Sequence, residues 1–246
     1  MVERGGTAFD FQADMTKPRS PGGALHTVLL DIDGTLIDSN DAHARAWVAA
    51  LSAHGYEVPF EKIRPLIGMG GDKILPELTG LDPDSGEAER ISNTRGEIFV
   101  TKELPTLRPT PGARALLEHM RARGLELVVA TSAKADEVEL ILTQAGVADL
   151  IQAASSSDDA ERSKPDPDIV RAALRKSGRP ASHSAMLGDT PYDVEAAARA
   201  RVPAVALRCG GWTDDGLRGA LAVYDNPADL LAHYDDSPFG RATISS

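Results

Sequence analysis

The chain has 246 residues, of which 42% are hydrophobic and 26% are charged, a balance typical of a folded protein with its own hydrophobic core. Its 37 acidic and 26 basic side chains give a formal net charge of −11, which argues against a partner bound through a nucleic-acid backbone. No apolar run approaches the roughly 20 residues that cross a bilayer, so we expect neither a nucleic-acid nor a membrane partner.

The first 24 residues differ in composition from the rest of the chain. They mix Gly, Pro, Arg and Asp without a hydrophobic period, so we expect a disordered tail over residues 1–24. The N-terminus also lacks the apolar core of a secretory signal, which favours a cytoplasmic location.

A short apolar run, Val28 to Leu30, marks the first element and stops at Asp31. Continuous apolar runs of this length are typical of strands that are buried on both faces of a parallel sheet. The carboxylates of Asp31 and Asp33 lie two residues apart at the end of this strand and repel each other unless a cation lies beside them. The pair therefore predicts a hard divalent metal, although an acidic turn at Asp33-Gly34 is an alternative.

Residues 41–108 interrupt the pattern of buried strands. This stretch offers helical segments at 42–54, 72–78 and 87–103 and no second strand of the first type. We therefore expect a small all-helical cap over 41–108, inserted into a core formed by residues 25–40 and 109–246. Gly68 to Lys73 matches neither common nucleotide-binding glycine pattern, and we expect a cap loop that faces the substrate.

Strand and helix patterns alternate after the cap. Apolar runs at 125–130, around 150–151, at 185–187 and at 202–207 predict four more buried strands, and positions spaced i, i+3, i+4 and i+7 predict helices between them. Thr110 is the expected N-cap of the first of these helices. The alternation predicts an α/β fold: a Rossmann-like parallel sheet with helices on both faces and a ligand site at the carboxyl ends of its strands.

Three further polar motifs lie in this second part of the chain. Thr131 and Ser132 end a predicted strand, where hydroxyl groups can bind a phosphoryl oxygen, although Thr and Ser are common at such positions. Lys164 lies in a Pro-flanked segment that can hold a positive charge beside carboxylates. Asp189 follows another strand, and with Asp31 and Asp33 it predicts a carboxylate cluster that binds metal, for which Mg²⁺ is the natural candidate.

Asp193 has a purely structural explanation as well. Thr190, Pro191 and Asp193 form the N-cap, first residue and first-turn acid of a typical helix start. This explanation does not cover Asp189, which lies where sheet topology places ligands. The single cysteine, Cys209, cannot form an internal disulfide, and with no histidine close to it in the sequence we expect a packed residue.

Taken as an ordered set, these four motifs resemble those of the haloacid dehalogenase-like hydrolase superfamily, over about residues 27–234. The helical insertion resembles the cap of the phosphoglycolate phosphatase-like and β-phosphoglucomutase-like branch. The resemblance implies that Asp31 is the nucleophile, Asp33 the general acid and base, and Lys164 the lysine that neutralises charge.

The resemblance also assigns the binding residues. Thr131, with Ser132 beside it, and Lys164 would bind the phosphoryl group of the substrate. Asp189 would bind Mg²⁺ with Asp31 and Asp33, and Asp193 would support the metal site.

The implied function is a magnesium-dependent phosphatase that hydrolyses a small phosphorylated metabolite through an aspartyl-phosphate. A first alternative is a sugar phosphomutase of the β-phosphoglucomutase type, but those relatives carry an arginine near the position of Gly71. A second alternative is a non-catalytic protein that binds a phosphate ligand, although such a protein has no need of Asp31. No obligate protein partner is evident.

Overall fold

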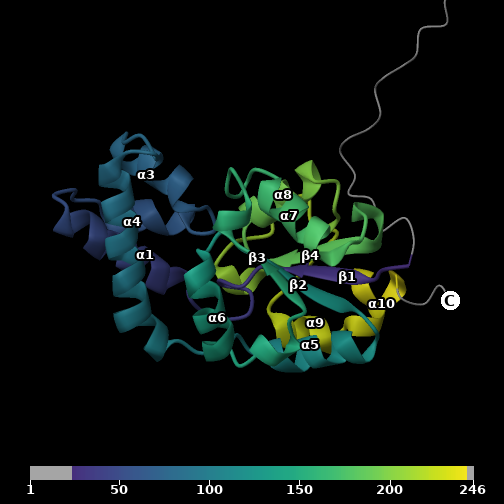
Figure 1. Cartoon of the computed structure of the whole chain (residues 1–246). Coiled ribbons are helices and arrows are strands. Elements are labelled where there is room, and N and C mark those ends of the chain that lie inside the picture. The colour runs from purple at the N-terminus through teal and green to yellow at the C-terminus, as the bar shows by residue number, and fades with distance from the viewer. Residues whose placement is uncertain (1–23, 243–246) are drawn as a thin grey trace, which may run out of the picture.

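The computed structural model describes residues 24–242. The tail expected over residues 1–24 therefore lies, except for its last residue, outside the described part of the chain. Figure 1 shows a sheet with helices above and below it, and a separate group of helices to one side, which includes α1 (Asn40–Ala53), α3 (Gly71–Thr79) and α4 (Gly86–Ile98). Within the described residues, no helix combines the length and the apolar character that a membrane span requires.

The core is a six-stranded sheet with the strand order β3-β2-β1-β4-β5-β6. Every neighbouring pair is parallel. The strands are β1 (Thr27–Leu30), β2 (Glu126–Ala130), β3 (Ala153–Ser155), β4 (Ser184–Gly188), β5 (Ala204–Leu207) and β6 (Ala222–Tyr224). From β1 the chain builds the sheet first towards β3 and then, from β4, towards β6. Open α/β sheets bind ligands at this reversal of direction, beyond the carboxyl ends of the strands.

Helices cover both faces of the sheet because alternate strand residues point to opposite sides. Val28 and Leu30 pack into one hydrophobic cluster and Leu29 into another. The first cluster includes residues of the helices α5 (Ala113–Ala122), α6 (Ala135–Gln144), α9 (Pro227–Ala232) and α10 (Pro238–Ala242). The second includes residues of α7 (Asp168–Ser177) and α8 (Pro191–Arg199).

The inserted helices form a smaller unit with its own hydrophobic core. They are α1 (Asn40–Ala53), α2 (Phe60–Ile63), α3 (Gly71–Thr79) and α4 (Gly86–Ile98), and a π-helical turn at Phe99–Glu103 follows α4. Trp47, Ile74 and Ile91 are among the buried residues of this core. The predicted parallel α/β sheet with an inserted helical cap is confirmed, and the limits of the cap at residues 41 and 108 remain our proposal.

The two connections between the cap and the core lie side by side. Ile37 forms an isolated bridge with Pro109, and the backbone N–H of Thr110 donates to the carbonyl of Leu36 at 3.1 Å. The Thr110 hydroxyl donates to the carbonyl of Thr35 at 2.7 Å. Thr110 is therefore not the N-cap of α5, as the sequence predicts; the N-cap is Gly112, whose φ of 79° is left-handed.

The predicted strands differ from the observed ones in two places. The strand expected around 150–151 is wrong: Ala148–Leu150 form a 3₁₀ turn, and the strand β3 begins at Ala153. Leu150 is apolar because it is buried in the cluster that packs under α5 and α6. The strand β6 is absent from the predictions because its three residues are only partly buried at the edge of the sheet.

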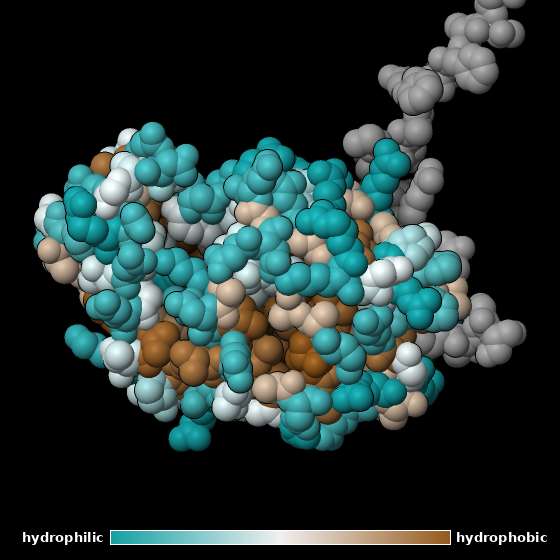
Figure 2. All heavy atoms as spheres, in the orientation of Figure 1, coloured by the Kyte–Doolittle hydropathy of each residue, from teal (hydrophilic) through white to brown (hydrophobic). Residues whose placement is uncertain are grey.

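The surface of the molecule follows the layers of the fold. In the orientation of Figure 1, hydrophilic residues cover most of the cap and the helices above the sheet, whereas hydrophobic residues form a band across the lower half of the core (Figure 2). The band lies on the side of α5 and α6, whose buried faces contribute to the larger hydrophobic cluster.

Candidate active site

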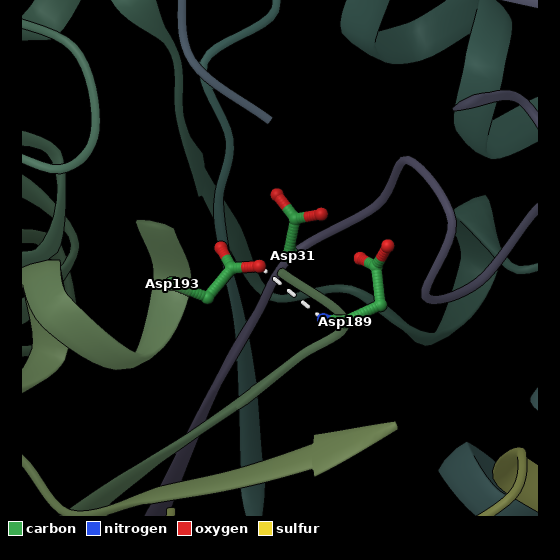
Figure 3. A group of neighbouring side chains, drawn as sticks. All are labelled: Asp31, Asp189 and Asp193. Carbon is green, nitrogen blue, oxygen red and sulfur yellow. Dashed lines mark hydrogen bonds between the residues drawn. The ribbon is translucent and has the colours of Figure 1, made fainter. Parts of the chain in front are cut away.

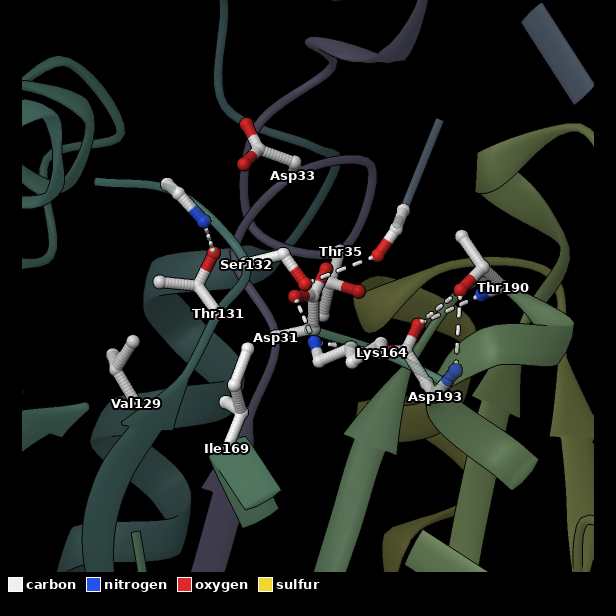
Figure 4. A network of polar contacts seen from close by, with 12 residues as sticks. Asp31, Asp33, Thr35, Val129, Thr131, Ser132, Lys164, Ile169, Thr190 and Asp193 are labelled. Atoms are coloured by element: carbon white, nitrogen blue, oxygen red, sulfur yellow. Dashed lines mark hydrogen bonds and ion pairs between the residues drawn. The ribbon is translucent and has the colours of Figure 1, made fainter. Parts of the chain in front are cut away.

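Asp31 begins the site at the carboxyl end of β1. Its backbone N–H donates to the carbonyl of Leu187 at 2.9 Å, which continues the pairing of β1 with β4 and fixes where the side chain emerges. Lys164 Nζ lies 2.5 Å from Asp31 Oδ1 and 2.7 Å from Asp193 Oδ1 (Figure 4). With only 1% of its surface exposed, Lys164 is a buried cation held between two carboxylates.

Asp189 and Asp193 meet Asp31 beside this lysine. One oxygen atom from each of the three carboxylates lies within 4.8 Å of the other two, and all three side chains are buried (Figure 3). Asp189 accepts hydrogen bonds at 2.8 Å from both the Thr35 hydroxyl and the Asn40 side-chain amide. These contacts orient its carboxylate from two segments that follow β1.

Asp193 belongs both to the start of α8 and to this cluster. Its Oδ2 accepts from the backbone N–H of Thr190 at 3.0 Å, and the Thr190 hydroxyl accepts from the N–H of Asp193 at 3.3 Å, which is a reciprocal capping box. The other oxygen faces Lys164. The helix start expected from the sequence therefore also brings the carboxylate of Asp193 into contact with Lys164.

Two glycines make room for the carboxylate of Asp189. Gly34 has a φ of 76°, and a Cβ there would clash with Asp189 Oδ2 and with Asn40. A Cβ at Gly210 would clash with the same oxygen. Glycine is required at these positions because the backbone approaches a buried side chain more closely than any Cβ allows.

The charges of the cluster do not balance. Burial raises the pKa of Asp31 well above its ordinary value, and Asp193 and Asp189 add to this rise, while Lys164 opposes it. Burial and Asp193 raise the pKa of Asp189 to about 7. For Lys164, burial acts against the charged form, but Asp193 and Asp31 raise its pKa above the ordinary value.

This donor set fits a divalent cation. Three buried carboxylates share one lysine, so negative charge remains in a site from which water is largely excluded. Carboxylate oxygens are the ligands that Mg²⁺ prefers, and a cation here would favour the ionised form of each carboxylate. Asp31, Asp189 and Asp193 are therefore three side chains that could hold such a metal.

The side chain of Asp33 lies outside this group of three. Its Oδ1 accepts a hydrogen bond from Ser39 at 2.6 Å and lies 2.8 Å from Nε2 of His43. Burial tends to raise the pKa of Asp33, but His43 and Ser39 outweigh it, so the pKa is lower than usual. Metal binding by the Asp33 side chain stays a prediction. Its contacts with Ser39 and His43 suit proton transfer better than metal binding.

Thr131 and Ser132 follow β2 at the same edge of the sheet. The Thr131 hydroxyl accepts from the N–H of Ala133 at 3.1 Å, which makes a tight turn at the strand end. The Ser132 hydroxyl lies 3.3 Å from the carbonyl of Gly68 in the cap. Both residues line a cavity of about 50 Å³ together with Asp31 and Asp33.

The cap forms the remaining wall of this cavity. Its lining there consists of His43, Trp47, Ile67, Gly68, Met69, Gly70, Gly71, Ile74 and Arg95, and the core adds Ala133 and Glu137. The loop that starts at Gly68 thus faces the site, as the sequence suggests. It also contacts the segment of the catalytic lysine candidate: Gly70 N–H donates to Ser163 Oγ at 2.9 Å, and Asp72 accepts from the Ser163 N–H at 3.2 Å.

Sequence motifs do not identify three of the residues that line the cavity. His43 lies on α1 among small apolar residues, and its ring stacks on Phe99 with centroids 3.9 Å apart. Arg95 and Glu137 form a buried ion pair at 3.0 Å across 42 residues of sequence. The sequence offers one hint of a contact with Asp33. His43 is a buried histidine that lies ten residues after Asp33, and a polar side chain inside an apolar helix face needs a partner.

Cys209 is a packed residue with no nucleophilic character. It is partly buried, and its Sγ lies 3.1 Å from the carbonyl of Gly34. Burial and the nearby charge of Asp189 raise the pKa of the thiol to about 12, so it is protonated at neutral pH.

Comparison with known proteins identifies the family of the chain. Residues 28–207 match the family model described as haloacid dehalogenase-like hydrolase. The chain belongs to the haloacid dehalogenase-like hydrolase family. It is 30% identical to phosphoglycolate phosphatase of Rhodospirillum rubrum over 217 residues, which cover 82% of this chain and 88% of that protein. The predicted enzyme class, a haloacid dehalogenase-like phosphatase, is confirmed at this level.

Two further proteins are similar to this chain. A hydrolase from Pseudomonas syringae has a solved structure with a TM-score of 0.79 and 33% identity, over 86% of this chain and 98% of that one. The chloroplastic protein SUPPRESSOR OF QUENCHING 1 of Arabidopsis thaliana is 33% identical over 76% of this chain. This chain spans only 18% of the Arabidopsis protein, so the match concerns one part of a much longer molecule.

Proposed function

We propose that the protein is a magnesium-dependent phosphatase that hydrolyses a small phosphomonoester through an aspartyl-phosphate. The observation that carries this proposal is the position of Asp31, which lines the cavity and contacts a buried lysine beside two further carboxylates. Relatives named as phosphatases support hydrolysis as the outcome of the reaction.

The position of Asp31 in the cavity supports its role as the nucleophile. One of its oxygens would form a bond to phosphorus as the bond from phosphorus to the ester oxygen breaks, and water would then hydrolyse the resulting aspartyl-phosphate. Lys164 fixes the carboxylate and reduces its charge, which matters because an anionic nucleophile must approach an anionic phosphate. Mg²⁺, held by Asp31, Asp189 and Asp193, would supply the remaining positive charge that screens this approach.

Asp33 would move the protons of both half-reactions. It would protonate the leaving alcohol in the first half and accept a proton from the attacking water in the second. Ser39 and His43 hold its carboxylate in one orientation within the cavity. Against the effect of burial, His43 and Ser39 lower the pKa of Asp33, so the ionised form that the second half-reaction needs predominates, and the first half-reaction uses the less populated protonated form.

Asp33→Asn should lower kcat for an alkyl phosphomonoester by about 10²–10⁴-fold, the usual contribution of general acid–base catalysis. Asn keeps the shape of the side chain but can neither donate nor accept the transferred proton. With p-nitrophenyl phosphate, whose leaving group needs little protonation, the aspartyl-phosphate should accumulate and be visible by mass spectrometry of the intact protein.

Asp38→Asn serves as the matched control for this variant, because Asp38 is an exposed carboxylate on the same connection between core and cap. It should turn over both substrates at wild-type rates. Normal turnover of the alkyl ester by Asp33→Asn would contradict the role of Asp33 as acid and base.

Removal of Mg²⁺ should abolish phosphate release, and excess Mg²⁺ should restore it. EDTA leaves the three carboxylates with only Lys164 for compensation, so the folded state should also lose stability. At a metal concentration about 100 times its Kd, binding adds about 2.7 kcal/mol, which corresponds to an unfolding temperature about 5–10 °C higher. The two measurements are phosphate release and thermal unfolding; full turnover in EDTA would contradict the proposal.

The phosphomutase alternative is separated by product analysis. β-Glucose 1-phosphate with a trace of the bisphosphate should release inorganic phosphate if the protein hydrolyses the aspartyl-phosphate. Glucose 6-phosphate as the main product would instead show transfer to a sugar. The non-catalytic alternative is separated by the aspartyl-phosphate itself, because a binding protein forms none.

A further inference from the structure

The cavity contains an ion pair that the proposed reaction does not use. Arg95, on α4 of the cap, donates through Nη1 to Glu137 Oε2 at 3.0 Å, and Glu137 lies on α6 of the core. Both residues line the cavity that also holds Asp31 and Asp33. Their exposed fractions are only 8% and 3%, so this pair is part of the inner wall and not of the surface.

The orientation of the pair is fixed from two sides. The guanidinium of Arg95 lies 5.6 Å from the ring centroid of Trp47, within the range of a cation–π contact. On the other side, a Cβ at Gly96 would come within 3.0 Å of Glu137 Oε1. A glycine inside a helix is destabilising relative to alanine, but here it leaves the space that the Glu137 carboxylate occupies.

The charge of this wall is balanced within the pair. Among the described residues that line the cavity, Arg95 is the one lysine or arginine, and Glu137 already neutralises it. A substrate that brings a carboxylate would place a second anion beside Glu137 without a second cation, which is unfavourable in a desolvated site. A hydroxyl group both donates and accepts hydrogen bonds, so it can contact a guanidinium N–H and a carboxylate oxygen together.

We propose that Arg95 and Glu137 select a leaving group that is neutral and hydroxylated, so that the preferred substrates are small polyol or sugar monophosphates and not phosphate esters that carry a carboxylate. This inference rests on the proposed function. It assigns the phosphoryl end of the cavity to Asp31, which Lys164 contacts from outside the lining, and the alcohol end to the Arg95–Glu137 pair.

A matched pair of substrates tests the inference on the wild-type protein. 2-Hydroxyethyl phosphate and 2-phosphoglycolate share the same phosphate and first carbon, and they differ at the second carbon, which is a CH₂OH group in the first compound and a carboxylate in the second. With saturating Mg²⁺, kcat/KM should be at least about tenfold higher for 2-hydroxyethyl phosphate. Equal values, or a preference for 2-phosphoglycolate, would overturn the inference.

Glu137→Gln tests the cause of the preference. The amide removes the anion but still accepts from Arg95, so the ratio of the two kcat/KM values should shift towards 2-phosphoglycolate by about tenfold. The control Glu103→Gln removes the carboxylate of the exposed Arg45–Glu103 pair elsewhere in the cap and should keep the wild-type ratio. A folded Glu137→Gln protein with the wild-type ratio, or an equal shift in the control, would overturn the inference.

The outcomes separate this inference from the proposed function. Turnover of p-nitrophenyl phosphate without turnover of 2-hydroxyethyl phosphate would overturn only the inference that Arg95 and Glu137 select the leaving group, and would leave the proposed function standing. No Mg²⁺-dependent hydrolysis of any phosphomonoester would overturn the proposed function and the inference with it. Thermal unfolding reports whether each variant is folded, and the wild-type ratio decides the question even if Glu137→Gln fails to fold.

Discussion

Replacing Asp31 by Asn should lower the turnover of a small phosphomonoester by about 10⁴-fold or more, as expected when a catalytic nucleophile is lost. The amide has nearly the same shape and still accepts from Lys164, so the fold should survive, but it does not attack phosphorus. Two measurements apply: single-turnover phosphate release, and the mass of the intact protein after reaction, which should show no phosphoryl adduct.

The control for this prediction is Asp214→Asn. Asp214 is an exposed carboxylate paired with Arg208 at 2.6 Å, so its loss leaves the carboxylates of the site unchanged. Wild-type turnover is expected. If Asp31→Asn still released phosphate at the wild-type rate, the aspartyl-phosphate route would be excluded.

Lys164→Met should impair both folding stability and activity. It leaves the carboxylates of Asp31 and Asp193 buried without their cation, and breaking a buried pair on one side costs about 3–5 kcal/mol. The unfolding temperature without metal should fall by about 6–20 °C. Turnover should fall by about 10²–10³-fold, the usual effect of losing one preorganised charge at the reacting group.

Lys176→Met is the corresponding control. Lys176 also pairs with a carboxylate, Asp159, at 2.7 Å, but it is more exposed than Lys164, so the pair contributes little to stability. Thermal unfolding and steady-state kinetics are compared for the two variants with and without Mg²⁺. A Lys164→Met protein with the unfolding temperature of the wild type would show that the buried carboxylates do not need this cation.

The sequence is most informative where a strand end and a polar motif coincide. Asp31, Thr131 and Asp189 each follow an apolar run that forms a strand, and parallel strands bring their carboxyl ends to one edge of the sheet. The meeting of these residues could therefore be predicted from the order of elements alone. Lys164 is harder, because it lies in a loop before α7 and only its contacts with Asp31 and Asp193 reveal its place.

Other features depend on contacts that no local pattern records. Leu150 is apolar because it packs under the sheet from a 3₁₀ turn, so hydrophobicity alone suggests a strand that is not there. Thr110 is a residue type that is common at N-caps, but its hydroxyl donates to the carbonyl of Thr35 instead. Arg95 and Glu137 have ordinary positions on two amphipathic helices, and only the docking of the cap on the core brings them together.

The adjacent connections of the cap, where Ile37 bridges Pro109 and Thr110 bonds to Leu36, have a consequence for how such a molecule changes over time. The insertion leaves and re-enters the core at points that already touch, and the entropy of closing a loop between such points grows only slowly with its length. The segment between these two points can therefore be replaced without a change in the core. Mutation can lengthen, shorten or rebuild it, and with it the cap residues that line the cavity, while the order of the strands stays as it is.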